Sequence, residues 1–179
     1  MFAYHVVTER PMVLGQKIVF DADHHSGVYQ RVMERESLVR DVYAHPEKYP
    51  LPLEHHLDVA IRELAMEQVR QEKFPQYPSR MASLYVSQTL EESKRWAEFF
   101  TRIGRPTYAI VKLKVEGRCF IGDACNCFDG TPDLADNLAR AEHYWLKLPN
   151  ADGEPIHEML VDGVITVEEI VEEINANLP

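Results

Sequence analysis

The chain has 179 residues, of which 45% are hydrophobic and 27% charged, as is usual for a soluble globular protein. It contains no run approaching the roughly 18 apolar residues of a membrane span, and its N-terminus lacks the basic and apolar regions of a secretory signal. We therefore expect a cytoplasmic protein with one domain, residues 1–179, and no membrane partner. The net charge of −10 argues against binding to nucleic acid but is compatible with a small phosphorylated ligand or a basic protein.

The first half of the chain is predicted to be mainly helical. Short β-rich runs indicate strands at residues 2–8 and 17–20. Valines at helical spacing predict a helix at 28–43, and a longer apolar stripe predicts a second helix at 54–73. Three prolines between these helices forbid regular structure, so we expect an extended connector at 44–52.

The second half is predicted to be richer in strands. A strand at 83–87 leads into a helix that Thr89 caps and Gly104 ends. Alternation predicts a strand at 107–115, followed by a tight turn at Glu116-Gly117 and a strand at 118–121. A helix is expected to begin at Pro132 and to run through Trp145.

Two further elements are expected at the C-terminal end. Asp162-Gly163 lies between the apolar runs 158–161 and 164–167, which predicts a hairpin with a type I′ turn. Thr166 with Glu169 predicts the cap of a final helix that contains Ile174. Together the elements indicate an α+β fold, with helices packed on a mostly antiparallel sheet.

The common metal and nucleophile motifs are absent from the sequence. The pairs His24-His25 and His55-His56 are adjacent, so their side chains point in different directions, and we expect no metal site. Three cysteines lie within nine positions (Cys119, Cys125 and Cys127), but their spacing is not that of a zinc knuckle. No nucleophile elbow, dinucleotide fingerprint or phosphate-binding loop is present.

Five residues remain as a candidate site: His5, Arg80, Ser83, Tyr85 and Glu158. Each has an ordinary structural explanation. A strand histidine is often a core residue, a strand tyrosine is a good β-former, and an arginine or glutamate is often a surface charge. In chain order, however, they form a pattern: a strand histidine, a Ser-x-Tyr-x-Ser strand that enters a helix, and a late glutamate that opens an apolar hairpin.

This pattern resembles the His-Tyr-Glu signature of ADP-ribosyltransferase-like folds. The matching segments are YHVV (4–7), SLYVSQTLEESKRWA (83–97) and GEPIHEMLVDGVITV (153–167). Over nearly its full length the chain is also similar to a bacterial family of unknown function, through GQKIVFD, FPQYPSR, the same strand–helix unit and AEHYW.

The transferase resemblance implies that NAD is the substrate and that its nicotinamide–ribose bond is cleaved, either by transfer to a protein acceptor or by hydrolysis. It implies that His5 binds the adenosine-side ribose and that Tyr85 stacks on the nicotinamide. Arg80 would neutralise the pyrophosphate, and Ser83 would shape the strand edge. Glu158 would be the catalytic residue, which holds the nicotinamide-ribose hydroxyl and stabilises the oxocarbenium-like cation.

Several alternatives stay open from the sequence. Glu142 and Glu154 are other candidates for the catalytic glutamate. Arginine-modifying transferases carry an acidic residue two positions before theirs, where this chain has Ile156, so arginine specificity is not implied. The fold could instead serve as a non-catalytic module that binds a nucleotide or a basic protein. A third interpretation is a dimer that uses the tryptophans and the aromatic face Phe99–Phe100.

Overall fold

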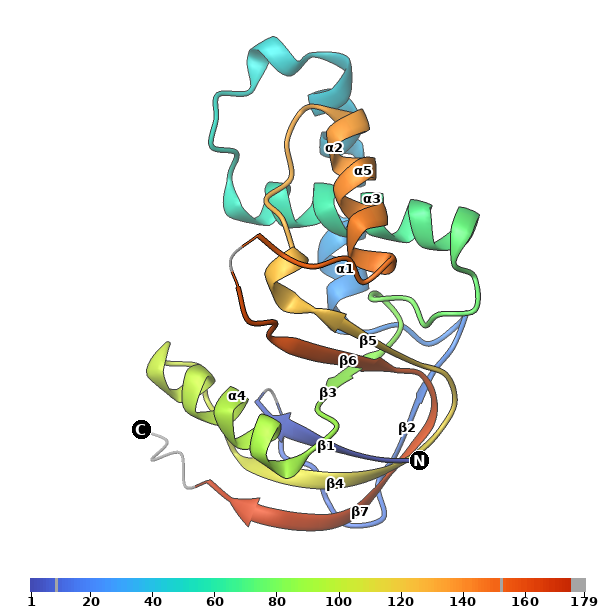
Figure 1. Ribbon diagram of the computed structural model, residues 1–179, viewed down its shortest axis with the longest axis vertical. Coiled ribbons are helices and arrows are strands. Elements are labelled where there is room, and N and C mark those ends of the chain that lie inside the picture. Colours follow the sequence, from blue (N-terminus) through green and yellow to red (C-terminus); the bar gives the residue numbers. More distant parts are fainter. Residues whose placement is uncertain (9, 152, 175–179) are drawn as a thin grey trace.

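The computed structural model describes residues 1–8, 10–151 and 153–174 and arranges them in layers (Figure 1). The strands are β1 (Phe2–Val7), β2 (Lys17–Phe20), β3 (Leu84–Val86), β4 (Ala109–Glu116), β5 (Cys119–Asp123), β6 (His157–Val161) and β7 (Gly163–Glu173). The helices are α1 (Gly27–Met33), α2 (Glu36–Ala44), α3 (His55–Lys73), α4 (Leu90–Arg102) and α5 (Leu134–Trp145), with 3₁₀ turns η1 (Pro46–Lys48) and η2 (Ala124–Asn126).

Two antiparallel sheets form the centre of the molecule. The first sheet has the strand order β1-β4-β7-β2, and the second has the order β3-β6-β5. Helices α1, α2, α3 and α5 lie on the far side of the second sheet, and α4 lies beside β1 (Figure 1). The predicted α+β class with antiparallel sheets and packed helices is therefore confirmed.

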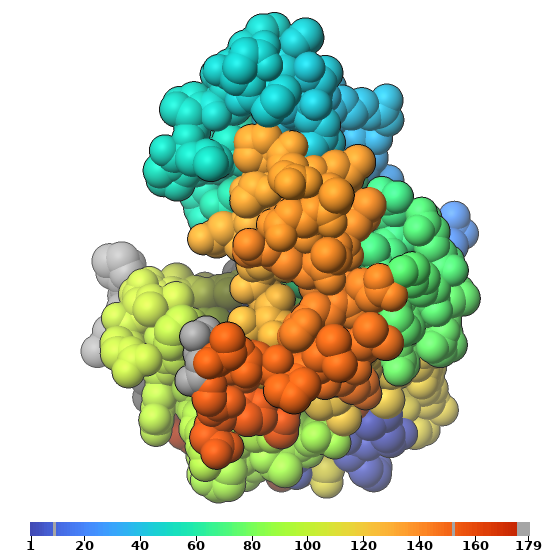
Figure 2. Space-filling view, turned by 45° about the horizontal axis from the view of Figure 1, so that its top comes forward, coloured from blue at the N-terminus to red at the C-terminus, as the bar shows by residue number. Residues whose placement is uncertain are grey.

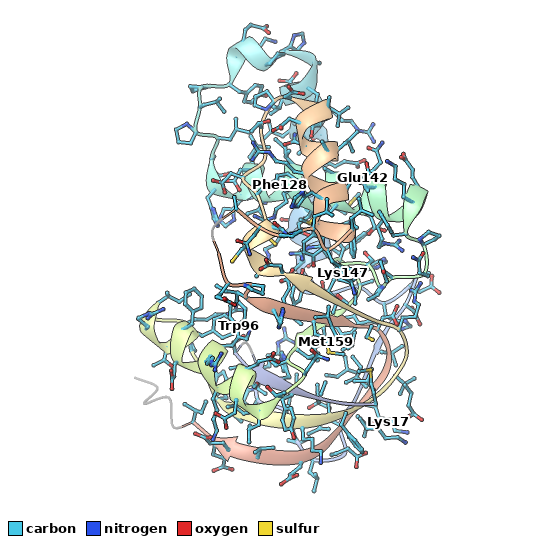
Figure 3. All side chains as sticks on the ribbon, viewed as in Figure 1. Lys17, Trp96, Phe128, Glu142, Lys147 and Met159 are labelled. Atoms are coloured by element: carbon cyan, nitrogen blue, oxygen red, sulfur yellow. The ribbon has the colours of Figure 1, made fainter. Side chains whose placement is uncertain are left out.

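The second sheet is buried on both faces, and strand β6 shows how. Successive side chains of a strand point to opposite faces. Met159 and Val161 pack in the core between the two sheets, where Figure 3 labels Met159. Leu160 points the other way, into a cluster with residues of α3 and α5. Trp145 of α5 donates its ring N–H to the carbonyl of Met66 in α3 at 2.8 Å, which ties these two helices together.

The hairpin predicted at 158–167 is wrong, because its two strands belong to different sheets. Strand β6 pairs with β3 and β5, whereas β7 pairs with β4 and β2. The final helix predicted from Thr166 is also wrong, since β7 continues to Glu173. Pairing with β4 extends as far as Ala109 opposite Glu173, and this long ladder overrides the local capping signal.

Both sharp turns near the sheet junction are corners between the sheets. The turn at Glu116-Gly117 leads from β4 to β5, and Asp162-Gly163 leads from β6 to β7. The corners touch so closely that a Cβ on Gly117 would lie 1.9 Å from the Asp162 carbonyl oxygen. Arg118 fastens this crossing by donating its backbone N–H and its Nε–H to the Asp162 carboxylate, at 2.7 and 2.8 Å.

The helix predictions hold with local changes. The predicted helix 54–73 is present as α3, and the capping box of Thr89 with Glu92 opens α4 as expected. The predicted helix 28–43 is interrupted between α1 and α2, and α5 begins at Leu134, capped by Asp133, rather than at Pro132. None of the helices in the described part of the chain is long and apolar enough to span a bilayer.

Replacing Gly117 by alanine tests the close contact between the Glu116-Gly117 corner and the Asp162-Gly163 corner. Its Cβ would overlap the backbone of Asp162, so one corner has to move, and we expect Gly117→Ala to lower the free energy of unfolding by about 1–3 kcal/mol. Urea unfolding followed by circular dichroism measures this. Gly27→Ala is the matched control, because its Cβ would meet only the end of the Arg31 side chain, at 3.5 Å. Equal stability of the two variants would contradict the close contact between the two corners.

Candidate functional site

Three of the predicted site residues meet on the helix-facing side of the second sheet. Tyr85 of β3 lies opposite Leu160 of β6, and Glu158 lies two residues before Leu160, so Tyr85 and Glu158 share one face. Arg80 lies in the turn before β3 and reaches the same face from the side. Sequence segments that are far apart are therefore brought together by the pairing of β3 with β6.

Arg80 is the centre of this cluster, and its side chain is almost fully buried. Its Nε and Nη2 donate to the two carboxylate oxygens of Glu63 on α3, at 2.8 and 3.2 Å. Its Nη1 donates to the Tyr144 hydroxyl on α5 at 2.7 Å and also to the Glu158 carboxylate. A buried charge is costly unless it is paired with an opposite charge. The positive charge of Arg80 is paired with a carboxylate on each side.

Two tyrosine rings complete the surroundings of Arg80. The guanidinium carbon lies 5.3 Å from the centre of the Tyr85 ring and 5.0 Å from that of the Tyr144 ring. At these distances the quadrupole of each ring attracts the cation. Tyr85 packs into the cluster of α3 and α5 residues, so its ring lies against Arg80 as well as against the apolar core.

The two oxygens of Glu158 have different surroundings. Oε1 accepts hydrogen bonds from Arg80, from the Tyr144 hydroxyl at 2.6 Å and from the Cys127 thiol at 3.8 Å. Among the described residues none donates to Oε2. The fully buried, unpartnered side-chain oxygens of these residues are on Asp58, Ser83 and Ser93, and the Glu158 side chain is 12% exposed, so Oε2 reaches solvent. The carboxylate is thus held by one oxygen and presents the other.

The donors to Oε1 are neutral groups apart from Arg80. Burial raises the pKa of the Cys127 thiol to about 12, so it keeps its proton at neutral pH. Burial also raises the pKa of the Tyr144 hydroxyl well above its ordinary value. For Glu63 burial opposes ionisation, but the charge and hydrogen bonds of Arg80 outweigh it and lower the pKa of this carboxyl. Glu63 is therefore a carboxylate at neutral pH.

His5 reaches β3 from the first sheet. Its Nδ1 lies 2.8 Å from the carbonyl oxygen of Tyr85. One residue earlier, Tyr4 exchanges two backbone hydrogen bonds with Ser87, at 2.9 and 2.7 Å. The structure thus brings His5 to the edge of β3, next to the backbone of Tyr85, while Arg80 and the Tyr85 ring lie on the helix-facing side.

The remaining sequence candidates lie in other surroundings. Ser83 is buried, and its hydroxyl has no hydrogen-bond partner among the described residues. Glu142, one alternative to Glu158, forms a surface ion pair with Lys73 at 2.6 Å. Glu154, the other alternative, is exposed. Of the three glutamates, Glu158 is the one that lies beside Arg80 and Tyr144.

Sequence reasoning missed Glu63, Tyr144 and Cys127. Glu63 is a charged residue of the predicted helix 54–73, yet it is buried and lies one turn from the buried Ala60 and Met66. Tyr144 falls within the AEHYW segment. The helical spacing of this segment does not indicate which strand residue Tyr144 contacts. Nothing local indicates that these residues gather around Arg80 and Glu158, because they come from α3, from α5 and from the segment after η2.

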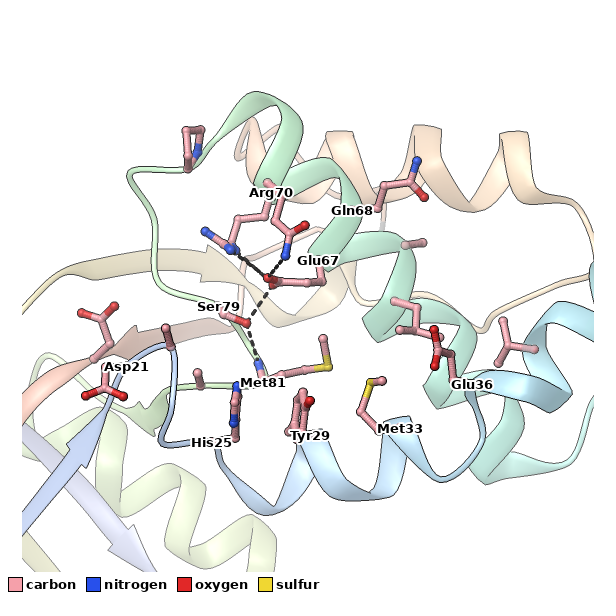
Figure 4. Close-up of a pocket in the computed structure, with 18 of the residues that line it drawn as sticks. Asp21, His25, Tyr29, Met33, Glu36, Glu67, Gln68, Arg70, Ser79 and Met81 are labelled. Carbon is pink, nitrogen blue, oxygen red and sulfur yellow. Dashed lines mark hydrogen bonds and ion pairs between the residues drawn. The ribbon is translucent and has the colours of Figure 1, made fainter.

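Two cavities lie elsewhere in the described part of the chain. The larger, of about 830 Å³, lies between α1, α2 and α3 and is lined in part by His25, Tyr29 and Met81 (Figure 4). The smaller, of about 420 Å³, lies beside η2 and is lined in part by Cys127. Neither is lined by Tyr85 or Glu158.

A hollow of the surface borders α4. Figure 2 shows it between α4 (yellow-green) and the orange segment that follows β5. Trp96 of α4 donates its ring N–H to the His157 carbonyl at 3.3 Å, so α4 lies beside the residue that precedes Glu158. No group of three His, Cys, Asp or Glu side chains within residues 1–8, 10–151 and 153–174 is arranged to hold a metal ion.

The fold and this cluster define an α+β protein with two antiparallel sheets. A glutamate, Glu158, is held on the helix-facing side of the second sheet. The chain belongs to the family described as "Protein of unknown function (DUF2441)", whose sequence profile matches residues 3–173. This confirms the sequence-based prediction of a family of unknown function. A search of curated proteins finds no match.

Removing the charge of Glu63 tests the role of Arg80. Glu63→Gln leaves a buried guanidinium short of one counter-charge, so we expect a loss of about 3 kcal/mol or more of unfolding free energy at pH 7. Glu36→Gln is the control, because the exposed pair of Glu36 with Arg40 should contribute less than about 1 kcal/mol. Urea unfolding of both variants measures the difference.

The same variant predicts a change in pH dependence. Folding lowers the Glu63 pKa below its ordinary value of 4.5, so Glu63 adds stability above that pH and loses it as the pH falls through the folded pKa. Between pH 7 and pH 3, Glu63→Gln should therefore lose less stability than the wild type. An equal loss in both proteins would show that Glu63 is not the carboxylate that Arg80 stabilises.

Proposed function

We propose that the chain binds NAD with the nicotinamide ribose against Glu158 and cleaves the nicotinamide–ribose bond, as an ADP-ribosyltransferase-like enzyme or an NAD glycohydrolase. The observation that carries this proposal is that the two oxygens of the Glu158 carboxylate have different surroundings. Oε1 takes three donors from the protein, and Oε2 is left to accept a hydrogen bond from a ligand hydroxyl.

The chemistry needs a carboxylate in this state. As nicotinamide leaves, positive charge develops on the ribose, and a negative group held in advance beside it lowers the barrier. A carboxylate that is only 12% exposed acts through a medium less polarisable than water, which strengthens its effect on the charge. Because Oε1 is already fixed, Glu158 need not lose freedom when the substrate binds.

The other residues divide into two groups under this proposal. Tyr85 is proposed to stack on the nicotinamide, His5 to bind the adenosine-side ribose, and Ser83 to shape the strand edge from inside the fold. Arg80 makes four hydrogen bonds to Glu63, Tyr144 and Glu158, which supports a role in holding Glu158 rather than in neutralising the pyrophosphate. The acceptor of ADP-ribose would be water or a protein side chain.

One observation favours a second candidate, a non-catalytic module that binds a nucleotide or a basic protein. Arg80, Glu63, Tyr144 and Glu158 satisfy one another as a buried polar network, and such a network stabilises a fold without any chemistry. Under this candidate, Glu158 would be a structural partner of Arg80 and NAD would not be cleaved.

Nicotinamide release from NAD distinguishes the two candidates. We expect the wild type to release nicotinamide and Glu158→Gln to release it at least about 100-fold more slowly, since a neutral amide cannot offset the developing charge. Glu154→Gln is the matched control: this glutamate is exposed and four residues away, so the variant should keep wild-type activity. Thermal melting of all three proteins checks that the fold is intact.

The outcomes separate the candidates. Binding of NAD, seen as a thermal shift, without nicotinamide release by the wild type would favour the binding module. If neither release nor a shift is seen at millimolar NAD, the NAD proposal is wrong. Loss of activity in Glu154→Gln with full activity in Glu158→Gln would show that Glu154, and not Glu158, is the catalytic glutamate.

A further inference from the structure

We infer that Tyr144 is a positioning residue, whose hydroxyl holds Oε1 of Glu158 against Arg80 and thereby keeps Oε2 turned toward the ligand. The kinetic part of this inference rests on the proposed function, whereas the orientation of the carboxylate does not. The Tyr144 hydroxyl accepts from Arg80 at 2.7 Å and donates to Oε1 at 2.6 Å, so it bonds to both partners of the direct ion pair between Arg80 and Glu158.

The ring of Tyr144 is fixed by its neighbours, which makes its hydroxyl a rigid anchor. Tyr144 has no exposed surface. Its ring centre lies 5.3 Å from that of Phe120 on β5 and 5.0 Å from that of Trp145. Close packing on both sides prevents the ring from following a moving carboxylate.

Strand β5 leaves room for this ring at one particular position. Gly122 lies directly opposite Glu158 in the pairing of β5 with β6. A Cβ on Gly122 would lie 2.7 Å from a ring carbon of Phe120 and 3.0 Å from two ring carbons of Tyr144, so a larger residue would displace these rings. The glycine across from Glu158 thus allows Tyr144 to approach the sheet closely enough to reach the carboxylate.

The direction of the hydrogen bonds follows from the protonation states. Burial raises the pKa of the Tyr144 hydroxyl, so it carries its single proton at neutral pH. It accepts from Arg80, which has only protons to give, and it therefore donates its own proton to Oε1. With Tyr144 and Arg80 on the same oxygen, rotation of the carboxylate would break both bonds.

Tyr144→Phe removes this hydroxyl and keeps the ring, so it isolates the anchor from the packing. Arg80 still contacts Glu158, and the Cys127 thiol remains at 3.8 Å, but the donor at 2.6 Å that limits rotation of the carboxylate is lost. Tyr43→Phe is the matched control. The Tyr43 hydroxyl also accepts a hydrogen bond within the helical layer, from Asn137 at 3.1 Å, and the residue takes no part in the Arg80 network.

The first test is a high-resolution crystal structure of Tyr144→Phe without ligand. We expect the Glu158 carboxylate to rotate or to occupy two orientations, while the backbone of β5 and β6 is unchanged. A single orientation, with Oε1 on Arg80 and Oε2 outward as in the wild type, would overturn the inference. This readout does not depend on whether the protein cleaves NAD.

The second test is steady-state nicotinamide release. We expect Tyr144→Phe to lower kcat by about ten- to a hundredfold, the effect of one hydrogen bond to a charged group, and to leave KM for NAD within about twofold. Tyr43→Phe should change neither constant. An active wild type with an equally active, folded Tyr144→Phe overturns the inference alone, whereas an inactive wild type overturns the proposed function and leaves the crystallographic test to decide the inference.

Discussion

The buried Arg80 is the group on which the rest of the site depends. A guanidinium inside a protein is tolerated only if its charge is met, and here Glu63 meets it from α3 and Glu158 from β6. Tyr144 adds a partner from α5. One side chain therefore joins the second sheet to two helices of the layer above it, and the position of Glu158 is a consequence of that junction.

The sheets supply the frame in which this junction forms. The crossing at Gly117 and Gly163 sends β5 and β6 into the second sheet, while β4 and β7 remain in the first. Strand β6 thereby gains a face of its own, directed at α3 and α5, on which Glu158 and Leu160 lie. A hairpin of β6 and β7 would instead have placed both strands in one sheet.

Local signals predicted much of this fold and part of the site. The stripe of α3, the capping box of α4 and the alternation of β4 depend on residues close in sequence, and each was found. The corner at Asp162-Gly163 was mistaken for a hairpin, because the same dipeptide suits both and only long-range pairing decides between them. For the same reason Glu63 and Tyr144 were missed: their partner, Arg80, lies 17 and 64 residues away.

The most direct test of the proposed role of Glu158 is a crystal structure of the wild type with an NAD analogue whose nicotinamide–ribose bond cannot be cleaved. The account predicts that Oε2 of Glu158 accepts a hydrogen bond from a hydroxyl of the nicotinamide ribose, while Oε1 stays on Arg80 and Tyr144. An analogue bound away from Glu158, or none bound at saturating concentration, would contradict it.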